Sequence, residues 1–223
     1  MSPSPADAPS RMPAEWEPHR ATWIAWPHHE PDWPGKLEII PWVYGEIVRI
    51  LSRHEPVNIL ITDPEAEKIA RHVLEQAAAD LARIRFWIVP TDRSWMRDSG
   101  PIFTIDDHGG KRILDWRFNG WAKYADCTAD DRVPAFVAEQ LGFERTQPMF
   151  GNWRIVLEGG SIDVNGRGSL LTTEECLLSP DVQVRNPGCS KAEMEKINAG
   201  LLDGSIGDER IAQLLASGTI RQG

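Results

Sequence analysis

Two hairpin patterns, at residues 101–118 and 155–173, constrain the fold of the chain more than any other feature. Residues 101–118 and 155–173 each read as strand, glycine-containing turn and strand, and Ile105 of the first aligns with Ile162 of the second. A helical pattern at 132–142 separates them. Internal similarity of this kind predicts an α/β fold of repeated ββαβ units arranged as blades. A single doubly wound sheet fits less well, because the hairpins require antiparallel pairing.

Short apolar runs alternate with helical patterns ahead of the hairpins. The runs at 22–27, 57–62 and 84–90 predict buried strands. Apolar residues at helical spacing predict a helix from Pro41 to about Arg53. A second helix is expected from the N-cap at Asp63, with proline at its first position, to about Leu81.

Three segments are expected along the chain. Residues 1–11 read as a disordered lead-in, 12–197 as the folded domain, and 198–223 as a tail unlike the rest. The tail contains one helical pattern, at 208–217, and no strand pattern. A further helix is expected after the capping box that begins at Ser190.

Composition narrows the function classes. The 223 residues carry a net charge of −9, which disfavours nucleic acid and suits a cationic ligand. The N-terminal stretch has no apolar run, so neither a signal peptide nor a membrane anchor is expected. The three cysteines are widely spaced and odd in number, which favours a reducing, cytoplasmic setting over a disulfide framework.

The stretch SWMRDSGP at 94–101 combines an indole, a guanidinium and a carboxylate at a strand end. A planar cation is best held by a carboxylate on its N–H edge and an aromatic ring on its face. Trp95 and Asp98 offer both, and Arg97 between them is expected to have a structural role. The alternative is that Trp95 belongs to the core and Asp98 caps the turn.

Further candidates lie in other loops. Glu158 precedes two glycines, where a ligand can approach the backbone, although an exposed Glu at a Gly-Gly bulge is the alternative. Trp121 belongs to an aromatic–polar cluster that serves either substrate binding or packing. The adjacent histidines at 28–29 lack partners at metal-ligand spacing, so no metal is expected. Acidic neighbours would raise the thiol pKa of Cys127 and Cys176, which disfavours both as nucleophiles.

Taken in order, these pieces resemble the agmatine deiminase and bacterial-type peptidylarginine deiminase family. The resemblance rests on an ordered set of motifs between Pro13 and Ile197, namely MPAEWEPHRATWIAWPH, SWMRDSGPIF, WRFNGWAKY, LEGGSIDVNGRGSLLTTEECLL and an Asn-Pro pair. It implies the pentein fold, an α/β propeller of five ββαβ repeats with the site at its centre. It also implies hydrolysis of a guanidinium to a ureido group and ammonia through a thiouronium on a cysteine.

The resemblance assigns roles to four residues. It makes Trp95 the stacking residue, Asp98 the guanidinium-binding and catalytic carboxylate, and Glu158 the acid that orients the catalytic histidine. Trp121 is a further substrate-binding candidate. No cofactor is implied, and the substrate is a small cationic guanidino compound. Agmatine, converted to N-carbamoylputrescine on the route to putrescine and polyamines, is favoured over arginine or peptidyl-arginine because the acidic chain suits a dication.

The sequence also departs from the family's pattern. None of the six histidines lies in a Gly-His-x-Asp motif, and no cysteine lies in a glycine-rich stretch near the C-terminus. About three of five blades are covered, so we expect a truncated or frame-shifted chain that is inactive alone. A non-catalytic remnant that binds a cation is the alternative. Exposed sheet edges would need another chain as cover, which leaves a homo-oligomer open.

Overall fold

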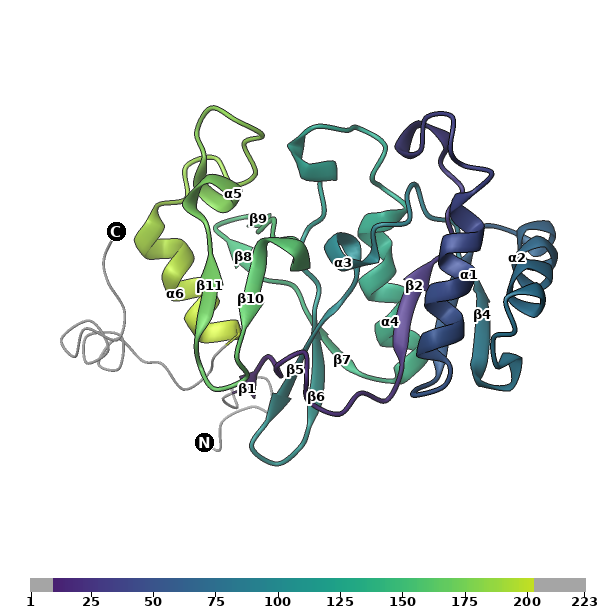
Figure 1. The fold of residues 1–223 in the computed structure, drawn as a ribbon. Coiled ribbons are helices and arrows are strands. Elements are labelled where there is room, and N and C mark those ends of the chain that lie inside the picture. Colours follow the sequence, from purple (N-terminus) through teal and green to yellow (C-terminus); the bar gives the residue numbers. More distant parts are fainter. Residues whose placement is uncertain (1–9, 203–223) are drawn as a thin grey trace. The chain divides into compact units, whose positions relative to one another are not determined.

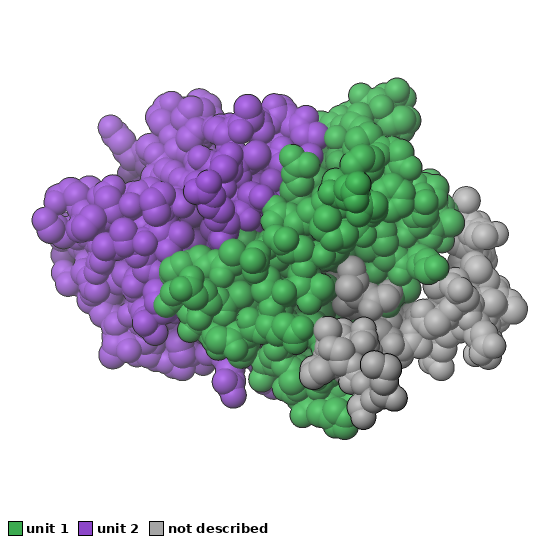
Figure 2. Space-filling model, turned by 180° about the vertical axis from the view of Figure 1, so that it is seen from behind, with its two compact units in different colours: residues 1–17, 101–117, 134–223 green, residues 18–100, 118–133 purple. Residues whose placement is uncertain are grey.

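The computed structural model describes residues 10–202, and the helix expected at 208–217 lies outside them. The chain forms two compact units, each assembled from separated segments (Figure 2). Unit 1 takes the residues up to Glu17, Pro101–Arg117 and those from Pro134 onward. Unit 2 takes Pro18–Gly100 and Phe118–Val133.

Unit 2 is built on a parallel three-stranded sheet in the order β2-β3-β4. The strands are β2 (Thr22–Ala25), β3 (Val57–Ile61) and β4 (Ile84–Ile88). Two crossover helices, α1 (Ile40–Leu51) and α2 (Pro64–Gln76), connect them and lie side by side over the sheet (Figure 1). The predicted succession of three strands and two helices is confirmed.

The core of unit 2 fills the space between the sheet and these helices. α1 and α2 approach closely at Gly45, where a Cβ would lie 3.1 Å from Val73 Cγ1 and 3.3 Å from Ala77 Cβ. The cluster is apolar throughout and comes from both layers. Its buried members are Trp26, Val48, Val57, Ile59, Ile61, Ala70, Val73 and Leu74.

The beginning of α2 follows the prediction and its end does not. The Asp63 carboxylate accepts hydrogen bonds from the first-turn amides of Glu65 and Ala66, at 2.8 and 2.9 Å. The helix stops at Gln76 instead of continuing to residue 81, because Ala78 adopts a left-handed φ of 57° that turns the chain. No glycine follows the end of α2, so the sequence does not predict where the helix stops.

Unit 1 contains one complete ββαβ unit. Strands β5 (Ile102–Asp106) and β6 (Lys111–Leu114) form an antiparallel hairpin. Helix α4 (Val133–Leu141) then leads to β7 (Glu144–Thr146), which pairs parallel with β6. The first hairpin and its helix are therefore confirmed, and the fold is α/β with mixed strand pairing.

The second predicted hairpin is shorter than its sequence pattern. β10 (Ile162–Val164) and β11 (Leu170–Thr172) pair antiparallel, and the residues from 155 to 161 precede the ladder. Helix α5 (Glu174–Leu178) follows, and then α6 (Lys191–Leu202). The predicted capping box is confirmed at α6, where the Ser190 amide donates to the Glu193 carboxylate at 2.8 Å and the Glu193 amide donates to Ser190 Oγ at 3.3 Å.

Two expected boundaries differ from the structure. Ser10 and Arg11 form β1 (Ser10–Arg11), which pairs antiparallel with β5, so the last two residues of the expected lead-in are in a strand. Helix α6 runs through the expected start of the tail at residue 198. The remaining short elements are α3 (Met96–Ser99), β8 (Met149–Phe150), β9 (Trp153–Arg154) and 3₁₀ turns at Glu30–Asp32, Leu81–Arg83, Gly120–Ala122, Asp130–Arg132 and Gly159–Ser161.

Candidate functional site

Trp95 stands in the loop after β4, immediately before α3. Its indole Nε1 donates to Asp32 Oδ2 at 3.0 Å, and its ring stacks on Trp33 with centroids 5.2 Å apart and an interplanar angle of 28°. The residue nevertheless keeps 36% of its surface exposed. The alternative that Trp95 is a core residue is therefore wrong, since its indole is fixed at the surface of unit 2.

Asp98 lies within α3, three residues after Trp95. Its backbone amide donates to the Trp95 carbonyl at 3.0 Å, which closes a single helical turn. This hydrogen bond ties the backbone of Asp98 to that of Trp95. Trp95 occupies the N-cap position of α3, without a side-chain cap hydrogen bond, and Asp98 lies within the helix. Arg97, between the two, is exposed.

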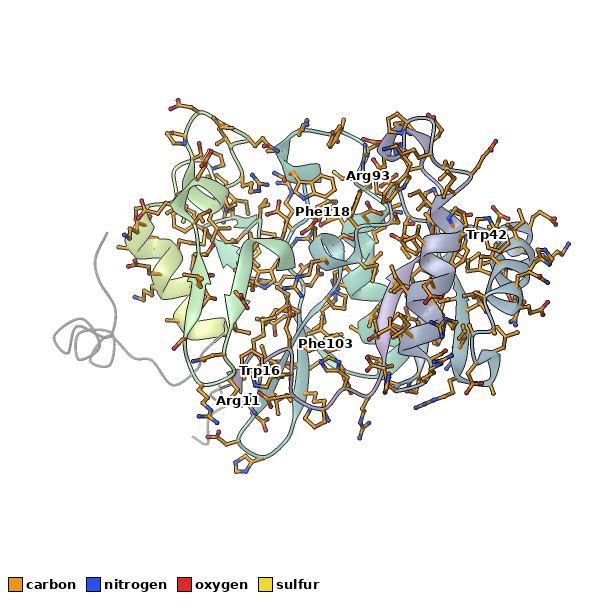
Figure 3. All side chains as sticks on the ribbon, viewed as in Figure 1. Arg11, Trp16, Trp42, Arg93, Phe103 and Phe118 are labelled. Carbon is orange, nitrogen blue, oxygen red and sulfur yellow. The ribbon has the colours of Figure 1, made fainter. Side chains whose placement is uncertain are left out.

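Arg93, two residues before Trp95, is a buried residue at the centre of a network that the sequence did not reveal. Its guanidinium pairs with Asp32 through Nη1 and with both oxygens of Asp126 through Nη2, at 3.0 and 2.9 Å. The Tyr124 ring lies 4.2 Å from its Cζ. Two carboxylates and an aromatic ring therefore hold an arginine of the protein itself. Figure 3 labels Arg93 in the loop that follows β4.

Trp121 joins the same network from the loop after β6. Its backbone has a left-handed φ of 59°, which is uncommon for a bulky residue. Its ring makes edge contacts with Phe118, 5.0 Å away, and with Tyr124, 6.0 Å away. Because Tyr124 also covers Arg93, a continuous series of contacts connects Trp95 with Trp121 inside unit 2.

Two aspartates tie the Arg93 loop to the turn at Asp130–Arg132. Asp130 Oδ1 accepts from the amides of Asp92 and Arg93, at 2.8 and 3.2 Å. In return, Asp92 Oδ2 accepts from the Ala129 amide at 2.7 Å. Asp130 is 1% exposed, and burial raises its pKa to about 6. A carboxyl group that titrates near neutrality thus supports the backbone beside Trp95.

Glu158 belongs to unit 1, whereas Trp95, Asp98 and Trp121 belong to unit 2. It is only 1% exposed, so the alternative of an exposed Glu at a glycine bulge is wrong. Arg185 Nε donates to both of its carboxylate oxygens, at 2.8 and 3.0 Å. The sequence suggested an acid at a ligand-accessible turn, whereas the structure shows a buried carboxylate already paired with a cation.

Asn186, next to Arg185, is a further buried polar residue of unit 1. Its Oδ1 accepts from the Val156 amide at 2.9 Å, and its Nδ2 donates to the carbonyls of Val156 and Leu177 at 2.9 and 3.2 Å. It satisfies backbone groups that no strand ladder reaches. The Asn-Pro pair of the sequence therefore has a structural explanation.

Metal ligation and thiol chemistry are further possibilities for a site in the described part of the chain. No cluster of His, Cys, Asp and Glu between residues 10 and 202 has the arrangement of a metal site. Burial, reinforced by the Glu193 carboxylate, raises the thiol pKa of Cys189, the opposite of what a nucleophile needs. Burial also lowers the pKa of His28, whose Nε2 lies 3.0 Å from Thr91 Oγ1. Within the same residues, no helix has the length and apolar character needed to cross a bilayer.

Comparisons with known proteins agree with the motif order. The sequence model of the Porphyromonas-type peptidyl-arginine deiminases matches residues 11–214. Agmatine deiminases from Stutzerimonas stutzeri (strain A1501) and Pseudomonas aeruginosa (strain LESB58) are each 38% identical over 191 residues. Those alignments cover 83% of this chain and 48% of each relative, so the chain spans about half the length of the curated relatives it matches.

Solved structures give the same result at the level of the fold. The agmatine deiminase of Enterococcus faecalis superposes with a TM-score of 0.73 at 32% identity, covering 86% of this chain and 50% of that one. A substrate-bound agmatine deiminase of C. jejuni gives 0.70 at 25% identity, covering 86% and 53%. With the family match extending over most of its length, the chain belongs to the Porphyromonas-type peptidyl-arginine deiminase family.

Proposed function

We propose that this chain provides the guanidinium-binding part of an agmatine deiminase-type hydrolase. In that reaction water replaces one nitrogen of a guanidinium, which gives a ureido group and ammonia. Applied to agmatine, the products are N-carbamoylputrescine and ammonia. The pentein arrangement of ββαβ blades, of which this chain would contribute about three of five, belongs to the same proposal.

The observation that carries the proposal is the fixed indole of Trp95 with Asp98 one turn later. Trp33 and Asp32 hold the indole from the protein side while part of it stays exposed. A ring held in this way can stack on a planar cation without losing rotamer freedom on binding. The Asp98 carboxylate is proposed to accept two N–H bonds from the cation's edge.

The chemistry explains why a carboxylate belongs there. A guanidinium is stabilised by resonance and stays charged at neutral pH, so it is a poor electrophile. Asp98 would fix its orientation and favour the cationic form, which keeps the central carbon electron-poor. Trp121 is proposed as a second aromatic contact for the substrate.

Catalysis requires groups that we place outside these 223 residues. A cysteine thiolate would attack the central carbon, ammonia would leave with a proton from a histidine, and that histidine would then activate water against the thiouronium. Glu158 is proposed as the acid that orients the histidine. In the present structure its carboxylate is paired with Arg185, so this role requires the histidine to bind the same carboxylate or to replace that contact.

A second function is a cation-binding module without catalysis. It is favoured by the absence of any Gly-His-x-Asp motif from the sequence, while the proposed binding residues are all present. Both functions predict the same ligand class. Agmatine is proposed over arginine because the net charge of −9 suits a dication, and a cytoplasmic location is proposed with it.

Calorimetric titration of the 223-residue chain with agmatine tests the proposal. We expect binding that weakens about tenfold or more in Asp98→Asn and in Trp95→Ala, since charged hydrogen bonds and cation–π contacts each contribute about 1–3 kcal/mol. The controls are Asp181→Asn and Trp153→Ala, which change an exposed carboxylate and a 47% exposed indole elsewhere. Equal affinities for all four variants would refute the assignment.

A product assay with the same chain tests whether the chain is catalytically active alone, which neither of the two proposed functions predicts. We expect no ureido product from agmatine or from arginine. If product forms, and if Cys176→Ala abolishes it, the nucleophile lies within this chain and the proposed division of the site is wrong.

A further inference from the structure

Asp32 connects two side chains that the reaction scheme leaves unrelated. Its Oδ1 pairs with the Arg93 guanidinium, and its Oδ2 accepts the Trp95 indole N–H at 3.0 Å. The Asp32 side chain is 6% exposed and that of Arg93 is 5% exposed. One buried carboxylate thus contacts both the internal arginine and the proposed stacking ring.

A buried carboxylate keeps its charge and its position only if a cation compensates it. Arg93 supplies that cation, and its planar fork is held at the other edge by the Asp126 carboxylate. Two contacts to carboxylates from different loops leave the guanidinium little freedom to rotate. Arg93 is therefore the permanently charged partner of Asp32, whose Oδ1 also lies 3.3 Å from His29 Nδ1.

The loop that carries Asp32 has no strand ladder to hold it. Residues 27–35 contain three prolines and a single 3₁₀ turn, Glu30–Asp32. Trp33, which stacks on Trp95, follows Asp32 directly. Hence the hydrogen bond to the indole and the ring that stacks on it both come from a loop held by local turn hydrogen bonds and by side-chain contacts.

We infer that Arg93 is a positioning residue for the substrate-stacking ring: through Asp32 it fixes both the orientation of the Trp95 indole and its stacking on Trp33. The ligand part of this inference rests on the proposed function, whereas the ring geometry does not. Arg93 does not touch the substrate in this account. Its effect on binding passes through the indole.

The ring geometry is tested first, on the full chain without ligand. Two stacked indoles give a coupled signal in the circular dichroism spectrum, and Trp95→Phe identifies that signal by abolishing it. We expect Arg93→Met to abolish the same signal. Arg71→Met is the matched control, because it removes a guanidinium 4.4 Å from the Phe86 ring in the same unit but away from this loop. An unchanged signal in Arg93→Met overturns the inference.

Agmatine affinity then distinguishes positioning from general support of the fold. Arg93→Met should weaken binding about tenfold in the native background, equal to about 1.4 kcal/mol. In the Trp95→Ala background, which lacks the ring, the same change should have less than about a twofold effect, because Arg93 then has no ring to position. Equal losses in both backgrounds indicate general structural damage and contradict the inference.

Two further outcomes keep the test decisive. If Arg93→Met does not fold, Arg93→Lys replaces it in the test. The lysine retains the buried charge but lacks the planar guanidinium that pairs with Asp32 and Asp126 at once. The inference then requires a folded lysine variant with a reduced indole signal, and a full signal overturns it. If the native chain does not bind agmatine, the proposed function fails while the dichroism result still decides the role of Arg93.

Discussion

Asp130→Asn is predicted to stabilise the protein at neutral pH. Asp130 is 1% exposed, and burial raises the pKa of its carboxyl from 3.8 to about 6. Its Oδ1 alone accepts the two backbone hydrogen bonds, from Asp92 and Arg93. An asparagine carbonyl oxygen can accept both of these bonds without the cost of a buried charge.

The size of the effect follows from the pKa difference between folded and unfolded chains. A difference of about 2 units corresponds to about 3 kcal/mol at 1.36 kcal/mol per unit. Because the folded pKa is the higher one, the folded state binds the proton more tightly. The ionised group therefore destabilises the fold above about pH 6. The cost disappears progressively as the pH falls from about 6 towards 3.8.

Urea unfolding of the native chain and of Asp130→Asn, at pH 7.5 and at pH 4, measures this cost of the buried charge. We expect the free energy of unfolding of Asp130→Asn to exceed that of the native chain by up to about 3 kcal/mol at pH 7.5. At pH 4 the difference between the two free energies should be close to zero. The exposed Asp181→Asn is the control and should show no pH-dependent gap. A destabilised Asp130→Asn at pH 7.5, or a gap that does not change with pH, would refute the reasoning.

Three further predictions concern unit 1 and are checked by urea or thermal unfolding. Glu158→Ala leaves the Arg185 charge buried without its counterion and should cost about 3–5 kcal/mol; a loss below about 1 kcal/mol would contradict the assigned pairing. Asn186→Ala removes three backbone-directed hydrogen bonds, and should cost about 3 kcal/mol. Gly166→Ala should destabilise more than Gly142→Ala. Both have left-handed φ, at 69° and 64°, but of the two only Gly166 is crowded, because a new Cβ there would meet Glu17 Oε1 and, at 2.6 Å, the Ala14 backbone nitrogen. Equal melting temperatures for these two variants would contradict the clash.

Local patterns predicted much of the fold. The hairpin of residues 102–114 and the helix that follows it are set by alternation, glycine turns and helical spacing, which the sequence states directly. The helix cap at Asp63 and the capping box at Ser190 are equally local. The early end of α2 was not predicted because Ala78 adopts the left-handed conformation, which glycine usually occupies.

The candidate site was only partly visible from the sequence. The pair Trp95 and Asp98 lies within four positions, so its spacing could be read directly. Asp32 and Arg93 are 61 residues apart, and nothing in either neighbourhood indicates that they pair. The available signal was Arg93, two residues before Trp95, because an arginine in a buried part of a loop requires an acidic partner. Likewise, no local pattern pairs Glu158 with Arg185, 27 residues later.

The central claim, that a guanidinium cation binds against the Trp95 indole, is tested most directly by the indole N–H signals in a nitrogen–proton correlation spectrum. The chain has ten tryptophans, and Trp95→Phe assigns the signal that matters. On titration with agmatine we predict that the Trp95 signal shifts in a saturable manner, that the Trp153 signal stays in place, and that Asp98→Asn weakens the response. A Trp95 signal that does not move at saturating agmatine would contradict the account.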